Sequence, residues 1–502
     1  MKINKVALIV PPTSEAEGST CGNRGCWQPL GPLALATQIS LACPEVEVRI
    51  LDGNILCLDV IKAEVVSFRP EFVGLSVLTP TAKIALHLVQ FIRQELGPDV
   101  IVVEGNDHAS RNLRYSLLPE KEVDAVAIGD NTHHVLPQVI QKGNIVGITN
   151  LGYGWGDEIV VPGRKDVYRL QDLPVPNRQL LDIRPYRDNY QSLYGKWHSA
   201  SMTPVTVNFA KGCAHASQIL QPGITDPDRC AYCDIWDLAM QTRSSQQVWE
   251  EVGLLVEQFG SNLILNEVCD SFTSFRKWIR QLLNARPTTI PSTVRWLVYA
   301  RAQELVQLQG LADLLAGLGV IRVNMGVDHG DDGMLNSLNK WNAQGTETNL
   351  RAAELLRDRG IQMFISFVLG VPGETEKSLQ NLLKHAEQLL QVGNVVCIDP
   401  SPLVPLPGAP IWAKITSPES AKELMQQHGL KGDANSAASY FAGECRDLDF
   451  VDLDEMCRRF VQYFCYVSYD DVLIPCLQEL YRLAEQYGAV PGGYGVPGRG
   501  WT

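Results

Sequence analysis

The chain has 502 residues, of which 45% are apolar and 20% charged, with a formal net charge of −13 and an isoelectric point near 5.3. This length allows two to four domains, and the acidic balance argues against indiscriminate binding to nucleic acids or anionic membranes. The apolar run at the N-terminus is too short for a signal peptide core, and no other run would span a membrane. We therefore expect a cytoplasmic protein with no nucleic-acid or membrane partner.

Residues 1–145 alternate short apolar runs with helical patterns. The runs EVEVRILDG, FVGLSVLTP, DVIVVEGND and VDAVAIGD are rich in β-branched residues, and each ends in turn-forming residues. Continuous apolar runs separated by helices are typical of a parallel, doubly wound α/β sheet that is covered on both faces. The sequence therefore predicts a Rossmann-like domain. Its ligand would lie at the carboxyl ends of the strands, under the long loop PPTSEAEGSTCGNRGCWQPLGP.

Three further regions follow along the chain. Residues 146–200 are irregular, and DLPVPNRQLLD within them indicates an extended linker. Residues 201–410 alternate strand and helix patterns again, in about six β/α units, which predicts a partial (β/α)6 TIM barrel. Residues 411–502 have a mainly helical pattern and are expected to form a C-terminal cap.

Three of the thirteen cysteines lie together in KGCAHASQILQPGITDPDRCAYCD, directly after the first strand of the barrel. Sixteen residues separate Cys213 from Cys230, and two separate Cys230 from Cys233. Loops that follow barrel strands build active sites. Because we expect no secretion signal, the cysteines are not expected to form disulfides. Three thiolates suit an iron–sulfur cluster with one open iron, or a zinc site completed by a residue such as His215. The spacing leaves both alternatives open, together with a segment that binds no metal.

Several stretches resemble the radical S-adenosylmethionine (SAM) enzymes, and in particular their cobalamin-binding subgroup. The order of the N-terminal runs follows the cobalamin-binding half of that family, and DLPVPNRQLLDIRPY resembles the linker between its halves. MGVDHGDDGMLNSLNKW and GIQMFISFVLGVPGETEKSL resemble late strands of the family barrel. The resemblance covers roughly residues 4–412. It implies a 4Fe–4S cluster on Cys213, Cys230 and Cys233, with SAM and cobalamin as further cofactors.

The resemblance also implies a set of residues around SAM. In the family, an aromatic residue precedes the third cysteine, and further SAM contacts follow the second to fifth strands. The corresponding residues in this chain are Tyr232, Asn266, Glu267, Arg301, Asp328, Val371 and Glu374. Three features depart from the family pattern. The first two cysteines are usually three residues apart, a diglycine usually stands where this chain has LNEVCDS, and a glutamate is common where this chain has Asp328.

For cobalamin, we expect contacts from the loops at the strand ends of the first domain. These residues are Pro12, Leu30, Gly31, Ser76, Leu78, Thr79, Gly105, Asn106, His108, Gly129 and Asp130. The Asp-x-His-x-x-Gly motif of other corrinoid proteins is absent, as it often is in the radical subgroup. His108 could ligate the metal or belong to the polar rim. Glycines at these positions would allow close approach of the backbone to the corrin.

The C-terminal region holds four more cysteines, at positions 445, 457, 465 and 476. They could carry an auxiliary cluster, but MCRRFVQYFCYVSY has the pattern of an apolar helical face, which favours packing in a core. Cys457 and Cys465 are also candidate hydrogen-atom donors to a substrate radical.

These features predict a cobalamin-dependent radical SAM methyltransferase. It would act through a 5′-deoxyadenosyl radical on an unactivated carbon of a peptide or natural product, and would need an external one-electron reductant. One alternative is a radical SAM enzyme that catalyses epimerisation, cyclisation or rearrangement, with or without cobalamin. The other is a non-catalytic protein that binds a corrinoid or SAM.

Overall fold

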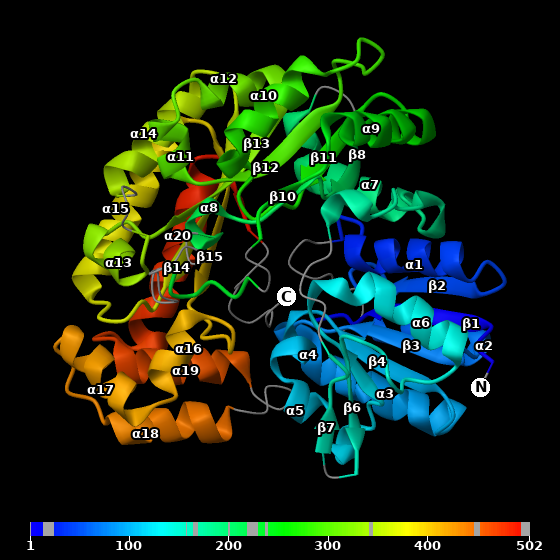
Figure 1. The fold of residues 1–502 in the computed structure, drawn as a ribbon. Coiled ribbons are helices and arrows are strands. Elements are labelled where there is room, and N and C mark those ends of the chain that lie inside the picture. The colour runs from blue at the N-terminus through cyan, green and yellow to red at the C-terminus, as the bar shows by residue number, and fades with distance from the viewer. Residues whose placement is uncertain are drawn as a thin grey trace. The chain divides into compact units, whose positions relative to one another are not determined.

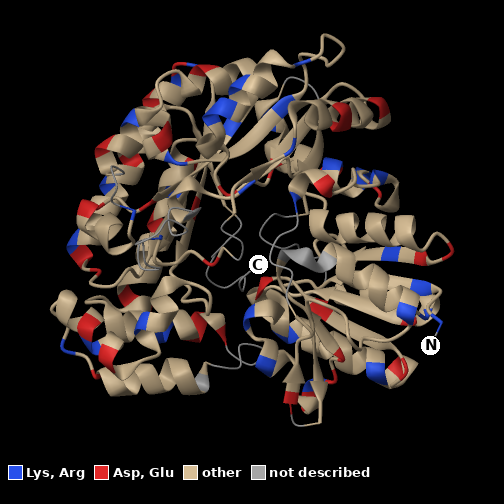
Figure 2. Ribbon diagram, viewed as in Figure 1, with Lys and Arg blue, Asp and Glu red and all other residues tan. Residues whose placement is uncertain are grey.

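The computed structural model describes residues 2–13, 25–156, 158–163, 169–198, 201–217, 229–235, 239–340, 345–445 and 452–492 (Figure 1). The chain forms two compact units. The first consists mainly of residues 1–206, and the second of residues 207–446 and 451–501. No helix in the described part of the chain is both long and apolar enough to cross a membrane. Lysine and arginine are interspersed with aspartate and glutamate along the helices of both units (Figure 2).

The first unit is built on a sheet with the strand order β2-β1-β3-β4-β5-β6-β7. Its parallel part comprises β1 (Lys5–Val10), β2 (Glu47–Asp52), β3 (Phe72–Ser76), β4 (Ile101–Gly105) and β5 (Ala125–Ala127). Val6 and Leu8 of β1 pack in one core cluster, and Ala7 and Ile9 pack in another on the opposite face. Burial on both faces explains why these strands are apolar throughout.

Helices cover both faces of this sheet. Side chains of α1 (Leu30–Ala42) and α6 (Val135–Lys142) belong to the first cluster, and those of α2 (Leu58–Phe68) and α3 (Ala82–Leu96) to the second. Two shorter helices, α4 (Asp107–Arg111) and α5 (Leu113–Ser116), follow β4. The carboxyl ends of the strands are thereby left to the loops, as in other doubly wound sheets.

Residues 146–200, expected to be irregular, contain regular elements. The hairpin of β6 (Leu151–Trp155) and β7 (Glu158–Val160) pairs antiparallel to β5, and α7 (Arg184–Tyr194) follows. The phenol of Tyr186 on α7 donates a 2.6 Å hydrogen bond to Asp52 Oδ2 at the end of β2. This buried bond attaches α7 to the first sheet.

The second unit contains a sheet with the order β16-β15-β14-β13-β12-β11-β8. Six strands correspond to the predicted units: β8 (Thr203–Val207), β11 (Leu263–Glu267), β12 (Arg295–Ala300), β13 (Val320–Asp328), β14 (Gln362–Leu369) and β15 (Val395–Pro402). All the pairings given for β11 to β15 are parallel. Along β14, fully buried residues alternate with partly exposed ones, so its two faces have different environments.

Helices lie along one side of this sheet (Figure 1). They are α9 (Ser245–Phe259), α10 (Arg276–Asn284), α11 (Ala302–Gln307), α12 (Leu311–Leu318), α13 (Asp332–Ser337), α14 (Thr346–Arg357) and α15 (Glu376–Val392). We call the opposite side of the sheet its inner face. A partial barrel of parallel strands with an outer layer of helices is the fold that the sequence predicts.

The C-terminal region is mainly helical, as expected. It contains α16 (Pro410–Ile415), α17 (Pro418–Gln427), α18 (Ala434–Ser439), α19 (Leu453–Phe464) and α20 (Ile474–Gln486). Phe441, Phe460 and Phe464 pack against one another, in edge-on or tilted pairs, in an aromatic core between these helices. One short strand was not expected: β16 (Val490–Pro491) pairs parallel to β15 at the edge of the sheet.

Candidate active site

The segment that carries the three cysteines is closed at its base by two short strands. β9 (Ala210–Lys211) and β10 (Gln241–Thr242) pair antiparallel, so the chain leaves and re-enters the second unit at one place. Gly212 follows β9 with φ +103°, and a Cβ there would lie 2.8 Å from the carbonyl oxygen of Ala239. Only glycine fits this position. Most of the insertion between Cys213 and Cys230 lies outside the described residues.

The backbone on both sides of Cys213 is bound to the loop that follows β11. The N–H of the preceding residue donates to Asp270 Oδ2 at 2.9 Å, and the N–H of the next residue donates to Ser274 Oγ at 3.1 Å. Ser274 Oγ in turn donates to Glu304 Oε1 at 2.6 Å. Ser271 and Thr273 also donate to the carboxylate of Glu304, through Oε2. Glu304 therefore holds the loop that positions Cys213.

Cys230 and Cys233 stand at the two ends of a turn closed by a 3.0 Å hydrogen bond from Cys233 N to Cys230 O. Between them, the phenol of Tyr232 donates to Asp328 Oδ1 at 2.7 Å, at the end of β13. Lys340 Nζ forms a 2.7 Å ion pair with the other oxygen of Asp328. Asp328 has φ +63° and lies at an irregularity in the pairing of β13 with β14. This backbone shape brings its carboxylate to the cysteine turn.

Burial dominates the electrostatics of the thiols. It raises the pKa of Cys233 to about 12, and it also raises the pKa of Cys230. The charge of Cys213 contributes to both shifts, so the three thiols lie within electrostatic range of one another. Thiols of this kind become thiolate ligands when a metal displaces their protons.

The three thiols of this segment suit an iron–sulfur cluster with one open iron, because a cubane places each thiolate on a separate iron. The proposed fourth zinc ligand, His215, has its Nε2 3.1 Å from the carbonyl oxygen of Asn339. Burial lowers the pKa of His215 to about 4.

Three further residues predicted to contact SAM lie at the ends of β11 and β12. Arg301 lies directly after β12, is largely buried, and contributes its charge to the pKa of Cys230. Its Nε has no hydrogen-bond partner among the described residues. Asn266 is buried near the end of β11. The carboxylate of Glu267 accepts hydrogen bonds from the N–H groups of Phe209 and Ala210. A contact of Glu267 with SAM would require an exchange of these bonds.

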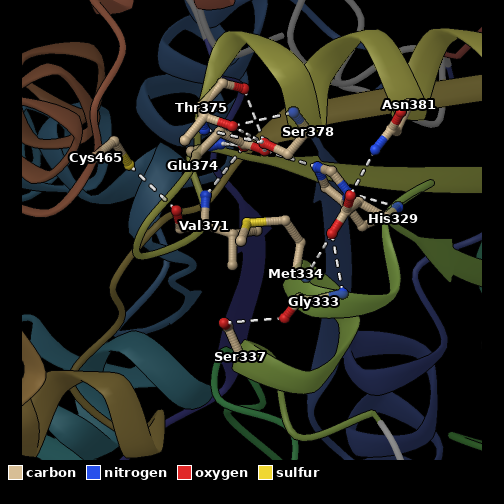
Figure 3. Close-up of polar contacts among 12 residues, drawn as sticks. His329, Gly333, Met334, Ser337, Val371, Glu374, Thr375, Ser378, Asn381 and Cys465 are labelled. Carbon is tan, nitrogen blue, oxygen red and sulfur yellow. Dashed lines mark hydrogen bonds and ion pairs between the residues drawn. The ribbon is translucent and has the colours of Figure 1, made fainter. Parts of the chain in front are cut away.

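Val371 and Glu374 belong to the turn that follows β14 (Figure 3). The buried carboxylate of Glu374 accepts bonds from Gly370 N at 2.7 Å and Val371 N at 3.3 Å. Its Oε1 lies 2.8 Å from Nε2 of the equally buried His329, the residue after Asp328. Glu374 thus links the loops after β13 and β14.

The C-terminal cysteines are mostly buried. Cys457 is fully buried, and its thiol donates to the carbonyl oxygen of Leu403 at 3.5 Å. Cys465 is partly exposed and donates to the carbonyl oxygen of Val371 at 3.3 Å (Figure 3). Of the two candidate hydrogen donors, Cys465 is therefore the one that touches the turn after β14.

The residues predicted around cobalamin lie at the carboxyl edge of the first sheet. Ser76 and Asn106 are hydrogen-bonded across β3 and β4 at 3.2 Å. His108 is buried, with its Nδ1 3.2 Å from Thr79 Oγ1, so its ring is part of the wall beneath the loops. Leu78 is 44% exposed.

The remaining predicted cobalamin residues occupy the neighbouring loops. Leu30 and Gly31 begin α1, Pro12 is buried after β1, Gly105 ends β4, and Gly129 follows β5 with φ +70°. The side chain of Asp130 is outside the described part. Exposed Leu78 and the open space at Gly31 suit the apolar face of a large planar ligand.

Sequence reasoning did not single out Lys340, His329 or Glu304. Lys340 and His329 lie within the stretch MGVDHGDDGMLNSLNKW, next to Asp328 in space or in sequence. A signal was present only for Glu304, since a carboxylate follows Arg301 at helical spacing. The partners of Lys340 and His329, Asp328 and Glu374, lie at the end of β13 and in the turn after β14, and spacing in the sequence does not indicate these contacts.

Two family models match the chain. Residues 23–135 match the B12 binding domain, and residues 227–386 match the radical SAM superfamily. Cys230 and Cys233 fall within the second match, and Cys213 precedes it. The chain therefore contains a B12-binding domain and a radical SAM domain. These domains imply a 4Fe–4S cluster, SAM and cobalamin as cofactors, as predicted.

Relatives of known sequence are named for different activities. The chain is 24% identical over 394 residues to the anaerobic magnesium-protoporphyrin IX monomethyl ester cyclase of Rubrivivax gelatinosus, covering 76% of this chain and 65% of the cyclase. The chain thus spans slightly less than two thirds of that relative. It is 23% identical over 422 residues to the uncharacterized methyltransferase PH0819 of Pyrococcus horikoshii, covering 82% of this chain and 83% of that protein.

Solved structures share the fold. TsrM from Kitasatospora setae, a radical SAM methyltransferase with cobalamin and a 4Fe–4S cluster bound, superimposes with a TM-score of 0.65 at 17% identity, covering 99% of this chain and 92% of that chain. OxsB, a cobalamin-dependent radical SAM enzyme, superimposes with a TM-score of 0.61 at 15% identity, covering 87% and 64%. These likenesses confirm the predicted fold class.

Proposed function

Because this chain joins a B12-binding domain to a radical SAM domain, we propose that it is a cobalamin-dependent radical SAM methyltransferase that methylates a carbon atom of a small natural product or peptide. Two likenesses support methyl transfer. The TsrM structure carries the methyltransferase name and aligns with nearly the whole chain, and PH0819, an uncharacterized methyltransferase, aligns over 83% of its own length. TsrM has also been solved with tryptophan as its substrate, which supports a small-molecule substrate here.

The observation that carries the proposal is the grouping at the end of β13. Cys230 and Cys233 flank Tyr232, which is bonded to Asp328, which is in turn paired with Lys340. The cysteines, with Cys213, would hold the cluster. Arg301 and Asp328 would bind the charged groups of SAM, and Val371 would line the adenine side. When bound, these cofactors supply an electron, an adenosyl radical and a transferable methyl group.

The residues of the chain would orient and enclose the reactants. Asp328 is buried beside Lys340, and its carboxylate would accept hydrogen bonds from a bound amine or hydroxyl group. The turn held by Glu374 fixes the backbone of Gly370 and Val371. Such pre-positioned groups would hold a bound reactant in one orientation.

The test uses the full chain, reconstituted anaerobically with iron, sulfide and hydroxocobalamin. We expect a brown protein with about four irons per chain that retains the corrin through gel filtration. With a reductant and SAM labelled in its methyl group, the label should enter an added substrate. C213A, C230A and C233A should each lose iron and turnover. C57A, at a partly buried cysteine of the first unit, is the matched control.

A second function has a specific observation in its favour. The cyclase relative shows that chains of this kind include enzymes whose name denotes ring closure. A radical reaction without methyl transfer would consume SAM and release 5′-deoxyadenosine, while the methyl label would stay in methionine. The distribution of the label between product and methionine therefore separates the two functions.

A further inference from the structure

The wide gap between the first two cysteines raises the question of what holds them at a fixed distance. Sixteen residues separate Cys213 from Cys230, and a loop of that length constrains the distance between its ends less than a loop of three residues does. A cubane nevertheless needs its thiolates at fixed places around it. Some other part of the fold must therefore set the distance between these two cysteines.

The helix α13 ends in a left-handed turn that faces the cysteine segment. Asn339 has φ +56°, and its N–H donates to the carbonyl oxygen of Asn336 at 3.0 Å. The N–H of Lys340 donates to the carbonyl oxygen of Leu335, also at 3.0 Å. These two bonds form a Schellman ending, in which glycine or asparagine commonly takes the left-handed position. We call Leu338, Asn339 and Lys340 the α13 anchor.

The anchor contacts the chain before the insertion through His215, two residues after Cys213. The Nε2 atom of His215 lies 3.1 Å from the carbonyl oxygen of Asn339. Because a carbonyl oxygen only accepts hydrogen bonds, Nε2 carries the hydrogen and donates it. The imidazole is only 6% exposed. The chain directly after Cys213 is therefore bound to the anchor.

The same anchor contacts the chain after the insertion, on both sides of Cys230. The side-chain amide of Asn339 donates from Nδ2 to the carbonyl oxygen of Arg229 at 3.2 Å. The N–H of Ala231 donates to the carbonyl oxygen of Leu338 at 3.0 Å. Asn339 thus binds the segment before the insertion with its backbone and the segment after it with its side chain.

Lys340 completes these contacts. Its Nζ lies 6.0 Å from the ring centroid of Tyr232, the residue that precedes the third cysteine, and forms the ion pair with Asp328 described above. All three residues of the anchor therefore contact the cysteine segment.

The other end of α13 is fixed as well. Asp331 caps the helix, since its Oδ1 accepts from the N–H groups of Gly333 at 2.9 Å and Met334 at 3.2 Å. Its Oδ2 accepts from Asn381 Nδ2 on α15 at 2.7 Å (Figure 3). A short helix that is held at its start by a neighbouring helix gives the anchor a defined position in the second unit.

We propose that the α13 anchor positions the iron–sulfur cluster by setting the distance between Cys213 and the turn of Cys230 and Cys233. His215 and Asn339 are then positioning residues, which act on the cluster through the backbone of its ligands. The anchor does the work that a short spacing does in chains where the first two cysteines are close together. This inference rests on the proposed cluster and is independent of methyl transfer.

The test measures how firmly the full chain holds its cluster after anaerobic reconstitution with iron and sulfide. The readouts are the rate at which the chelator bathophenanthroline removes iron and the electron paramagnetic resonance spectrum of the reduced cluster. H215L and N339G each remove one hydrogen bond to the anchor, and glycine keeps the left-handed backbone. Each variant should lose iron about two- to tenfold faster than the wild type and give a broadened spectrum.

Three controls separate positioning from ligation and from loss of the fold. H215Q keeps an N–H that reaches the carbonyl of Asn339, so it should lose iron at nearly the wild-type rate. N336A changes an exposed asparagine of the same helix and should match the wild type. Replacement of residues 218–228 by an equal number of glycines and serines keeps the anchor contacts on both sides, so iron content, rate and spectrum should stay the same. This replacement leaves α13 native and stands even if N339G fails to fold.

The inference is overturned if H215L and N339G hold iron as firmly as the wild type, or if the replacement of residues 218–228 loses the cluster. It is also overturned if H215Q loses iron as fast as H215L, because His215 would then be a ligand. Failure of the proposed function has different signs. C213A, C230A and C233A that keep their iron would contradict the proposed cluster itself, and a loaded wild type that transfers no methyl group would contradict methyl transfer alone.

Discussion

His385 on α15 offers a sharp test of how burial affects this fold. Its ring is 2% exposed, and the effect of burial on its pKa outweighs that of a hydrogen bond with Gln388. Burial lowers its pKa to about 4, against about 6.5 in an unfolded chain. As the pH falls below 6.5, the unfolded chain takes up this proton first, so the folded state loses stability until about pH 4. Below that value both states are protonated and the loss levels off.

The size of the effect follows from the difference between the two pKa values. A depression of roughly 2.5 units corresponds to about 3 kcal/mol of stability lost between pH 6.5 and 4. Between pH 7.5 and 6.0, where the protein is farther from its isoelectric point, the loss is about 0.8 kcal/mol. H385L removes the titrating group and keeps an apolar side chain in the space. The variant should therefore lack this part of the pH dependence.

The assay is urea unfolding followed by tryptophan fluorescence at a series of pH values from 7.5 to 6.0. The difference between wild type and H385L cancels the contribution of all other titrating groups. Parallel curves for wild type and H385L would refute the reasoning, because they would mean that His385 titrates alike in the folded and unfolded chain.

Three further predictions concern the contacts around the sites. G212A, at φ +103° against the carbonyl of Ala239, should reduce iron content after reconstitution to less than about half, measured as iron per chain; full loading would contradict the steric argument. K340M leaves the buried charge of Asp328 without its cation and should destabilise the second unit by about 3 to 5 kcal/mol, with partial recovery in K340M/D328N; no recovery would mean that the pair is not the cause. Y186F removes the donor to buried Asp52 and should cost about 1 to 3 kcal/mol in urea unfolding of the first unit, whereas an unchanged midpoint would show that solvent satisfies Asp52.

The sequence predicts the two sheets well because their strands carry strong local signals. In the first unit, Ala7 and Ile9 pack on the opposite face of β1 from Val6 and Leu8, so burial on both sides leaves a continuous apolar run. The hairpin β6–β7 was not predicted, because LGYGW contains two glycines and shows no such run. Its pairing with β5 is a tertiary contact that propensity does not report.

The candidate site also combines features that the sequence predicts with features that it does not. The three cysteines are visible as a group in the sequence, because their residue type and their loop are both unusual. The ion pair of Asp328 with Lys340 is not visible, because it depends on a left-handed residue at an irregularity between β13 and β14.

The strand pair β9–β10 has a consequence for the evolution of chains like this one. Because Lys211 and Gln241 are paired at the base of the cysteine segment, the ends of that segment are fixed regardless of what lies between them. Shortening the stretch between the first two cysteines from sixteen residues to three would shorten the segment between Lys211 and Gln241 from 29 residues to 16, which changes the free energy of loop closure by only about 0.5 kcal/mol. Changes in the length of this segment therefore cost little stability. Natural or laboratory selection could replace the segment while β9 and β10 stay the same.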